Sequence, residues 1–134
     1  MTSLLLDTNG YSALLCGDRK VLATLNDAAS LWFSVIVQGE LYAGFRAGTK
    51  YRQNVEALDR FLAMPSVQFA PVTQDTAEIF GELKAYLKSA GKPIPMNDVW
   101  IASQAIEHAA VLLTYDQHFQ ALPQVRLWEH FTGS

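Results

Sequence analysis

Residues 4–9 read Leu-Leu-Leu-Asp-Thr-Asn, and this stretch decides the fold. An uninterrupted run of three leucines is typical of a short strand that is buried on both faces, as in a parallel sheet covered by helices. Each of the three polar residues that follow can cap a helix, which is predicted to continue through Leu14 and Leu15. A buried strand followed at once by a helix is the first half of a βαβ unit.

The same alternation continues along the rest of the chain. Apolar runs predict further strands at 31–33, 67–70 and 111–114, with 125–127 as a candidate fifth strand. Helical spacing, caps and prolines predict helices over the ranges 21–28, 35–47, 51–64, 73–91 and 96–108. The alternation indicates an α/β fold with a parallel sheet and helices on both faces. No linker or repeat divides the chain, so we expect one domain over residues 1–134, with its ligand site beyond the carboxyl ends of the strands.

Composition and charge set further limits. The chain has 134 residues, of which 50% are hydrophobic and 17% charged, the profile of a folded domain rather than of a disordered chain. No apolar run is long enough for a membrane span, and the N-terminus lacks the basic segment of a signal peptide. The single cysteine, Cys16, is expected to be buried and reduced in a cytoplasmic protein. The net charge of −3 argues against a non-specific nucleic-acid coat.

Four carboxylates stand where chemistry is expected. Asp7 follows the first predicted strand and Asp116 the fourth. Asp98 opens a predicted helix, and Glu40 lies on a helix face of small apolar residues. Each has a structural alternative, because the three aspartates also suit helix caps, first turns and loops, and Glu40 could reach solvent. Four acids without a paired histidine or cysteine motif favour a hard cation such as Mg²⁺ or Mn²⁺ over zinc.

Bringing these acids together has electrostatic consequences. Like charges within several Å disfavour each other's ionised forms, so we expect at least one carboxylate pKa to be raised. Without the four acids, nine acidic residues remain against ten basic ones, and the remaining surface does not repel RNA. Basic residues gather at 46–60 and 84–92. They either contact RNA phosphates or form helix faces that are exposed to solvent.

Four blocks of sequence carry a family resemblance. They are Leu-Leu-Leu-Asp-Thr-Asn at 4–9, Ser-Val-Ile-Val-Gln-Gly-Glu-Leu at 34–41, Asn-Asp-Val-Trp-Ile-Ala-Ser at 97–103 and Leu-Leu-Thr-Tyr-Asp-Gln-His-Phe at 112–119. In this order and spacing, which spans nearly the whole chain, they resemble the PIN-domain ribonucleases and, among these, the VapC-type toxins of bacterial type II toxin–antitoxin pairs.

The resemblance implies a PIN-like three-layer α/β/α fold around a mostly parallel sheet of four to five strands. It also implies that one or two Mg²⁺ or Mn²⁺ ions are held by four acids, which are at once the metal ligands and the catalytic residues: Asp7, Glu40, Asp98 and Asp116. Family members often have a further acid two residues after the one that matches Asp116, but this chain has His118 there, so a second metal position stays open. Thr114 matches a polar residue that often lines the family's site.

The function implied by the resemblance is that of a toxin. The chain would be a metal-dependent endoribonuclease that uses water to cut structured RNA such as tRNA or rRNA, leaving 5′-phosphate and 3′-hydroxyl ends. The implied partners are a VapB-type antitoxin and a second copy of the chain, in a homodimer and a higher toxin–antitoxin assembly, without a membrane. The chemistry agrees with the residues, because an acid-bound Mg²⁺ activates water and needs no protein nucleophile.

Two other functions fit part of the sequence. A haloacid-dehalogenase-like phosphatase also has an aspartate after its first strand, but it needs a second one two residues later, where this chain has Asn9. A non-catalytic module that holds Mg²⁺ and binds RNA would use the same acids without cleavage. The antitoxin could bind an apolar groove formed around four aromatic residues: Tyr42, Phe45, Tyr51 and Phe61. The alternatives are that these aromatic residues belong to the core or to a contact in the homodimer.

Overall fold

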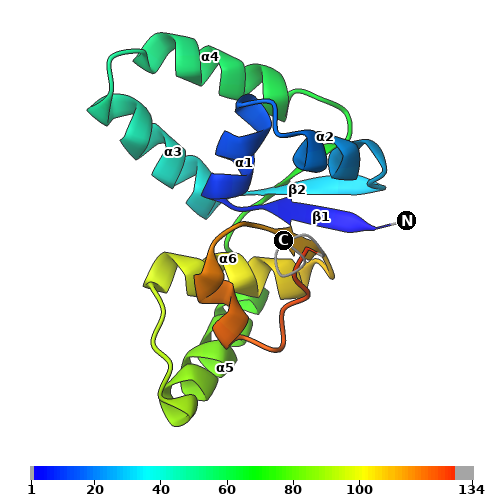
Figure 1. Cartoon of the computed structure of the whole chain (residues 1–134). Coiled ribbons are helices and arrows are strands. Elements are labelled where there is room, and N and C mark those ends of the chain that lie inside the picture. The colour runs from blue at the N-terminus through cyan, green and yellow to red at the C-terminus, as the bar shows by residue number, and fades with distance from the viewer. Residues whose placement is uncertain (1, 129–134) are drawn as a thin grey trace.

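The computed structural model describes residues 2–128 and has a four-stranded parallel sheet at its centre (Figure 1). The strands are β1 (Ser3–Leu6), β2 (Ser30–Ser34), β3 (Val67–Ala70) and β4 (Val111–Leu113), in the spatial order β3-β2-β1-β4. All three neighbouring pairs are parallel. β1 therefore lies inside the sheet, with Leu5 and Leu6 fully buried, as the leucine run predicts.

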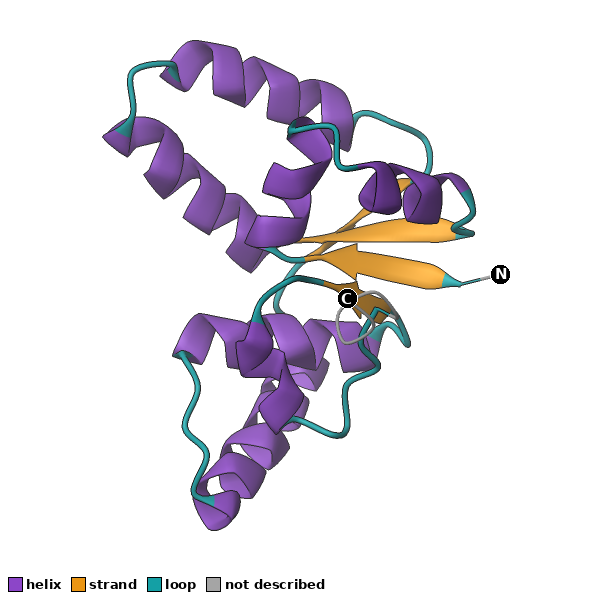
Figure 2. Ribbon diagram, viewed as in Figure 1, coloured by secondary structure: helices purple, strands orange, loops and turns teal. Residues whose placement is uncertain are grey.

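Helices cover both faces of the sheet, so the fold has the three layers expected from the sequence (Figure 2). One face carries α1 (Thr8–Leu15), α2 (Arg19–Asn26), α3 (Val35–Ala47) and α4 (Tyr51–Leu62). The other carries α5 (Gln74–Ala90), α6 (Met96–Glu107) and the short 3₁₀ helix η1 (Gln117–Ala121). In the described part of the chain, no helix combines the length and apolarity that crossing a membrane requires.

Polar residues at the junctions between strands and helices start the helices. Asp7 caps α1 by accepting a hydrogen bond from the Gly10 backbone N–H at 2.7 Å. Ser34 caps α3 through its hydroxyl, and Thr73 forms a capping box with Thr76 at the start of α5. These caps are local features of the sequence, so the helix boundaries agree with the predicted ones to within a few residues.

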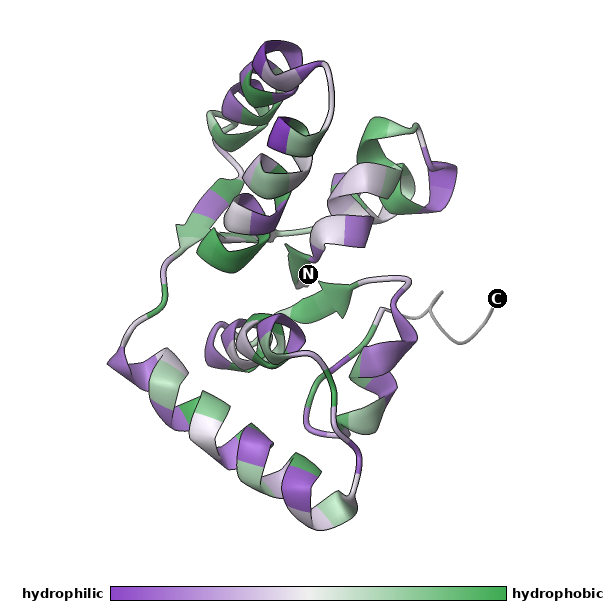
Figure 3. Ribbon diagram, turned by 90° about the vertical axis from the view of Figure 1, so that its left-hand side faces the viewer, coloured by the Kyte–Doolittle hydropathy of each residue, from purple (hydrophilic) through white to green (hydrophobic). Residues whose placement is uncertain are grey.

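The core lies on both sides of the sheet, and the helices show alternating hydrophobic and hydrophilic bands (Figure 3). Between the sheet and the first layer of helices, the rings of Tyr11, Phe33 and Phe61 pack edge to face with centroids 5.3 to 5.9 Å apart. In the opposite layer, Phe80 of α5 stacks on Trp100 of α6 at 3.9 Å. Phe61 is therefore packed against the core, which is one of the three roles considered for it.

Two local features differ from the prediction. The candidate fifth strand at 125–127 is reduced to an isolated parallel bridge between Leu112 and Leu127, because η1 and a turn bring only one residue into register with β4. Cys16 is exposed rather than buried. It is the C-cap of α1, and the neighbouring Leu15 is also 55% exposed, so the end of this helix faces solvent.

Candidate metal centre

The four predicted acids line one cavity at the carboxyl ends of the strands. The cavity has a volume of about 270 Å³, and its lining residues are Asp7, Thr8, Asn9, Glu40, Asp98, Ile101 and Asp116. Asp7 follows β1 and Asp116 follows β4, whereas Glu40 comes from α3 and Asp98 from α6. Parallel strands present their carboxyl ends at the same edge of the sheet, so residues far apart in the sequence meet there.

Asp7 is the most buried of the four acids, with 4% of its surface exposed. Its Oδ1 accepts the hydrogen bond from the Gly10 backbone, and its Oδ2 accepts one from Thr114 Oγ1 at 2.5 Å. Burial raises the pKa of Asp7 to about 6, against the lowering effect of these two hydrogen bonds. The charges of Asp116 and Asp98 raise the pKa further but contribute less than burial does.

The hydroxyl of Thr114 connects two of the acids. Thr114 is fully buried directly after β4 and donates its hydrogen bond to Asp7. The same oxygen accepts a hydrogen bond from the Asp116 backbone N–H at 2.8 Å. The buried Thr114 hydroxyl thereby holds Asp7, which follows β1, next to the turn that follows β4.

Glu40 lies between the beginnings of two helices. Its Oε1 accepts a hydrogen bond from Thr8 Oγ1 of α1 at 2.5 Å, and its Oε2 accepts one from Asn97 Nδ2 of α6 at 3.2 Å. The small residues on its helix face leave room for the carboxylate to turn inward. Glu40 is half-buried in the cavity wall rather than extended into solvent.

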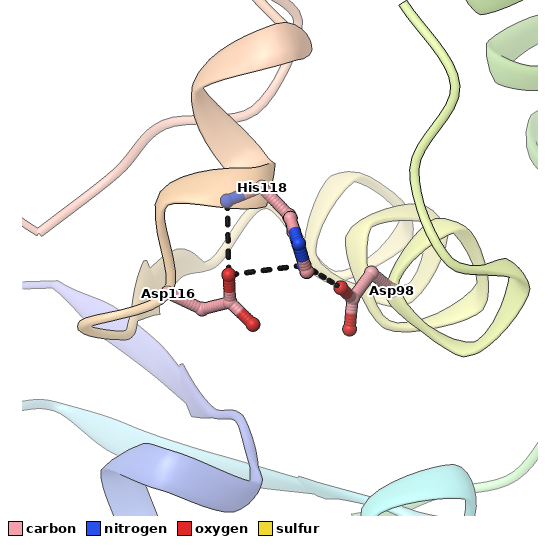
Figure 4. A group of neighbouring side chains, drawn as sticks. All are labelled: Asp98, Asp116 and His118. Atoms are coloured by element: carbon pink, nitrogen blue, oxygen red, sulfur yellow. Dashed lines mark hydrogen bonds and ion pairs between the residues drawn. The ribbon is translucent and has the colours of Figure 1, made fainter.

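Asp98 and Asp116, which line the cavity, form a compact cluster with His118 (Figure 4). The Nδ1 atom of His118 lies 2.9 Å from Asp98 Oδ2 and 3.1 Å from Asp116 Oδ1. Burial raises the pKa of Asp98, although its hydrogen bond with His118 lowers it. The hydrogen bond with Asp98, followed by the charge of Asp116, raises the pKa of His118.

The pKa expectation for the acids is correct in direction, but its main cause is different. The carboxyl pKa values of Asp7 and Asp98 are both raised, as we expect for acids placed together. In each case the largest cause is burial in a poorly solvated wall, and repulsion between the carboxylates is smaller.

The aspartates also fill the structural roles that the sequence offers as alternatives. Asp7 caps α1, Asp98 lies in the first turn of α6, and Asp116 caps η1 by accepting a hydrogen bond from the His118 backbone N–H at 2.9 Å. The caps and the cavity do not compete, because each carboxylate oxygen has two lone pairs and can accept a hydrogen bond while it also faces an ion.

Three hydrogen-bond donors around the cavity are not assigned a role in the site by the sequence pattern. Thr8 and Asn97 orient Glu40, and the backbone N–H of Gly10 orients Asp7. Each is adjacent in sequence to a predicted acid or one turn beyond it, and this proximity is the only signal that points to them. The direction of their hydrogen bonds depends on how α1, α3 and α6 pack.

The donor set fits a hard divalent cation. The cavity gathers four carboxylates, and among the ion pairs between residues 2–128 the cationic partner of these acids is His118 alone. Mg²⁺ and Mn²⁺ prefer oxygen ligands of this kind. A bound cation would also offset the cost of burying the charge of Asp7.

Comparisons with known proteins identify the family and the fold. The model of the PIN domain family matches residues 4–125. The chain is 34% identical to Ribonuclease VapC4 of Mycobacterium tuberculosis, over 70% of this chain and 72% of that protein. It is 29% identical to Ribonuclease VapC1 of Haemophilus influenzae strain R2866, over 96% of this chain and 97% of that protein.

Solved structures show the same fold over nearly the whole chain. A chain in the crystal structure of VapBC2 from Rickettsia felis, bound to a DNA fragment from their promoter, matches with a TM-score of 0.83 at 29% identity, covering 94% of this chain and 97% of that one. A chain of VapBC-1 from nontypeable Haemophilus influenzae matches with a TM-score of 0.82 at 27% identity, covering 94% and 96%.

Proposed function

This chain belongs to the PIN-domain family, and from this premise we propose that it is a metal-dependent endoribonuclease, the toxin of a VapC-type toxin–antitoxin pair. The observation that carries the proposal is the convergence of four acids on one cavity at the carboxyl edge of a parallel sheet. The proposed metal ligands and catalytic residues are Asp7, Glu40, Asp98 and Asp116. We propose that the chain works as one nuclease domain in the cytoplasm.

A bound Mg²⁺ or Mn²⁺ ion would supply Lewis-acid chemistry, by orienting the scissile phosphate and lowering the pKa of the attacking water. The chain itself supplies orientation. Asp7 is held by Gly10 and Thr114 and Glu40 by Thr8, so their oxygens point into the cavity before RNA binds. Ligands fixed in this way need little rearrangement during the reaction.

We expect hydrolysis to leave 5′-phosphate and 3′-hydroxyl ends, because water attacks phosphorus and the P–O3′ bond breaks: the 3′ oxygen leaves as a hydroxyl, and the phosphate stays on the 5′ oxygen of the next nucleotide. The proposed substrate is structured RNA such as tRNA or rRNA. Basic side chains on the helices are available to contact its phosphates: Arg46, Arg52, Arg60, Lys84 and Lys88.

The phosphatase alternative is wrong for this chain, because the PIN-domain model matches residues 4–125 and Asn9 takes the place of the second aspartate. A non-catalytic RNA-binding module remains as one outcome of the test. It predicts metal and RNA binding without cleavage.

The test is cleavage of purified tRNA and rRNA by the full chain in Mn²⁺ or Mg²⁺, with EDTA as the metal-free arm. We expect endonucleolytic cuts that EDTA abolishes, and a loss of about a hundredfold or more in Asp7→Asn and Glu40→Gln. The matched control is Asp59→Asn, an exposed acid of α4 outside the cavity lining, which should cut at the wild-type rate. RNA that is bound but left intact in Mn²⁺ would favour the non-catalytic module.

The proposed protein partner is a VapB-type antitoxin, because related chains occur in structures of VapBC complexes. A groove of about 390 Å³ between α1, α2 and α4 offers an apolar surface, with Leu14, Leu22, Leu25 and Met64 among its lining residues. Of the four aromatic residues expected around such a groove, Phe61 is the one that lines it. Expression without antitoxin should arrest growth, and Asp7→Asn should relieve the arrest.

We also propose a homodimer. Several large apolar side chains are exposed on the single chain, including Leu22, Met64, Phe69 and Met96. Phe69 and Met96 do not line the groove proposed for the antitoxin, so a second copy of the chain could cover them. Light scattering of the purified toxin should therefore give the mass of two chains, and the mass of one chain at high concentration would contradict the proposal.

A further inference from the structure

His118 is a nitrogen donor within the acid cluster. Its Nδ1 faces carboxylate oxygens of Asp98 and Asp116, which come from different elements (Figure 4). One donor atom from each of these three residues lies within 4.8 Å of the other two. The ring nitrogen therefore sits at the centre of the cluster, although the side chain is half exposed.

The spacing of these atoms is that of neighbouring ligands on one metal ion. Ligands about 2.1 Å from an octahedral ion lie about 3 Å from each other. The two nitrogen–oxygen distances are 2.9 and 3.1 Å. An ion could therefore contact all three residues after only small movements of the side chains.

Backbone hydrogen bonds fix the main chain from which the ring projects. The His118 N–H donates to Asp116 Oδ1 at 2.9 Å, and the Asp116 N–H donates to Thr114 Oγ1 at 2.8 Å. Asp116 and His118 thus form one fixed unit after β4, and this unit faces Asp98 on α6. The ring is thereby placed beside Asp98 by the fold of the main chain.

Building on the proposed function, we propose that His118 binds the divalent ion through Nδ1 and shifts the preference of the site from Mg²⁺ toward Mn²⁺ and other borderline transition ions. Mg²⁺ is bound almost entirely by oxygen, whereas imidazole suits transition metals. A neutral imidazole also leaves the site less negative than a further carboxylate would. Both effects weaken Mg²⁺ relative to an ion that gains from a nitrogen ligand.

The same distances fit one competing arrangement, in which a protonated ring is itself the cation between Asp98 and Asp116. The two arrangements predict opposite effects of removing the ring. If His118 is a ligand, its removal weakens metal binding. If the ring takes the place of the metal, its removal strengthens binding, because two carboxylates become available to the ion.

Mn²⁺ binding to the purified full chain without antitoxin separates these arrangements. Mn²⁺ affinity is measured by titration with electron paramagnetic resonance, and Mg²⁺ affinity by competition. We expect His118→Asn to weaken Mn²⁺ binding about tenfold or more, the range seen when metal sites lose a supporting group. His118→Asp should bind Mg²⁺ better than wild type, so that the preference for Mn²⁺ falls. Gln120→Asn, an exposed residue of the same 3₁₀ helix, is the control and should bind like wild type.

Electron spin-echo modulation of bound Mn²⁺ gives a readout that does not depend on catalysis. A nitrogen bound directly to Mn²⁺ modulates the echo, and labelling of histidine with nitrogen-15 changes the modulation frequency. We expect this signal in wild type and in Gln120→Asn, and its loss in His118→Asn.

Two outcomes would overturn the inference, and they bear differently on the proposed function. If Mn²⁺ binds without a histidine signal, or binds as tightly or more tightly in His118→Asn, then His118 is no ligand. The proposed function still stands in that case if the same samples cut RNA in Mn²⁺ and not in EDTA. If wild type does not bind Mn²⁺ at millimolar concentration, both this inference and the metal-dependent mechanism fail.

Discussion

Asp7 combines two roles that are usually filled by different residues. It caps α1 through Gly10, and it forms the buried wall of the acid cavity, where Thr114 supplies a second hydrogen bond. Burial raises its pKa to about 6, which means that the fold binds a proton at Asp7 more tightly than the unfolded chain does. Holding this side chain as a carboxylate costs the metal-free protein stability.

The cost should appear as a dependence of stability on pH. Because the folded-state pKa of Asp7 is raised, the free energy of unfolding of the metal-free protein falls as pH rises between the unfolded pKa, 3.8, and about 6. The expected fall from about pH 4.5 to about pH 6 is about 1–2 kcal/mol. Urea unfolding in EDTA measures it. His118 is largely protonated in both states over this range and contributes little.

Asp7→Asn is the variant that isolates this effect. Asparagine caps helices as well as aspartate does, so α1 should still form. We expect the fall with pH to be clearly smaller in the variant than in wild type, with Asp98 contributing a residual slope of the same sign because its pKa is also raised. Equal slopes in the two proteins would mean that Asp7 is not the group responsible.

Gly10 should not tolerate a side chain. A Cβ atom there would lie 2.6 Å from the backbone oxygen of Leu113 and 3.2 Å from Asp7 Oδ1. The Leu113 oxygen belongs to β4 and cannot turn away, so α1 must shift and loosen its hydrogen bond to Asp7. We expect Gly10→Ala to lower the free energy of unfolding by about 1–3 kcal/mol and to reduce RNA cleavage.

Gly81→Ala is the matched control for that variant. Gly81 lies in the middle of α5, and a Cβ atom there meets nothing within 4 Å. Alanine should stabilise the exposed helix by about 0.5–1 kcal/mol and leave cleavage unchanged. If the two variants have the same stability and activity, the close approach at Gly10 does not constrain the site.

At the scale of elements, Gln104 ties two strand ends to a helix. This fully buried side chain of α6 accepts a hydrogen bond from the Ser34 hydroxyl at the end of β2. Its Nε2 donates to the backbone oxygens of Ala70 at 2.8 Å and Pro71 at 3.3 Å, where β3 ends. A single side chain of α6 therefore satisfies polar groups at the ends of two strands.

Gln104→Leu keeps nearly the same size but removes these hydrogen bonds. It leaves the Ala70 oxygen and the Ser34 hydroxyl buried without their partner, and we expect a loss of about 2–3 kcal/mol in the free energy of unfolding. Denaturant unfolding at neutral pH measures the loss. Gln53→Leu, on the exposed face of α4, should stay within about 0.5 kcal/mol of wild type. A Gln104→Leu protein as stable as wild type would show that water replaces the missing partner.

At the scale of the whole molecule, the cavity joins the two layers of helices. Asp7 and Glu40 come from the start of α1 and from α3, on one side of the sheet, and Asp98 comes from α6 on the other (Figure 1). An ion held by all of them can bind only when both layers are in place. Ligands that bind the native state alone stabilise it by mass action.

Thermal melts at neutral pH should therefore depend on metal. Mn²⁺ at a hundredfold excess over its dissociation constant should stabilise wild type by about 2.7 kcal/mol. Asp98→Asn should gain much less from Mn²⁺. In EDTA the variant should be more stable than wild type, since burial and, less strongly, neighbouring charges raise the pKa of Asp98 and disfavour its ionised form. A variant that melts lower in EDTA and gains fully from Mn²⁺ would show that Asp98 is only a first-turn residue of α6.

The sequence by itself determined the order of the elements and the positions of the four acids. Apolar runs such as 4–6 and caps such as Ser34 are local signals, because strand burial and helix starts depend on neighbouring residues. The rule that parallel strands end at one edge then predicts that Asp7 and Asp116 meet. The structure confirms the three-layer fold and places these acids around one cavity, while their role as metal ligands stays a prediction.

Only the tertiary structure decided the environment of each side chain. The burial of Asp7, its hydrogen bond to Thr114 and the position of His118 between two acids all depend on how distant segments pack. The exposure of Cys16 has the same origin, because it depends on which segments pack against the end of α1. The solvation of a side chain and the geometry of its hydrogen-bond donors depend on several segments at once. A pattern along the chain can therefore predict which residues meet, but not the pKa values of the acids or the set of groups that would bind an ion.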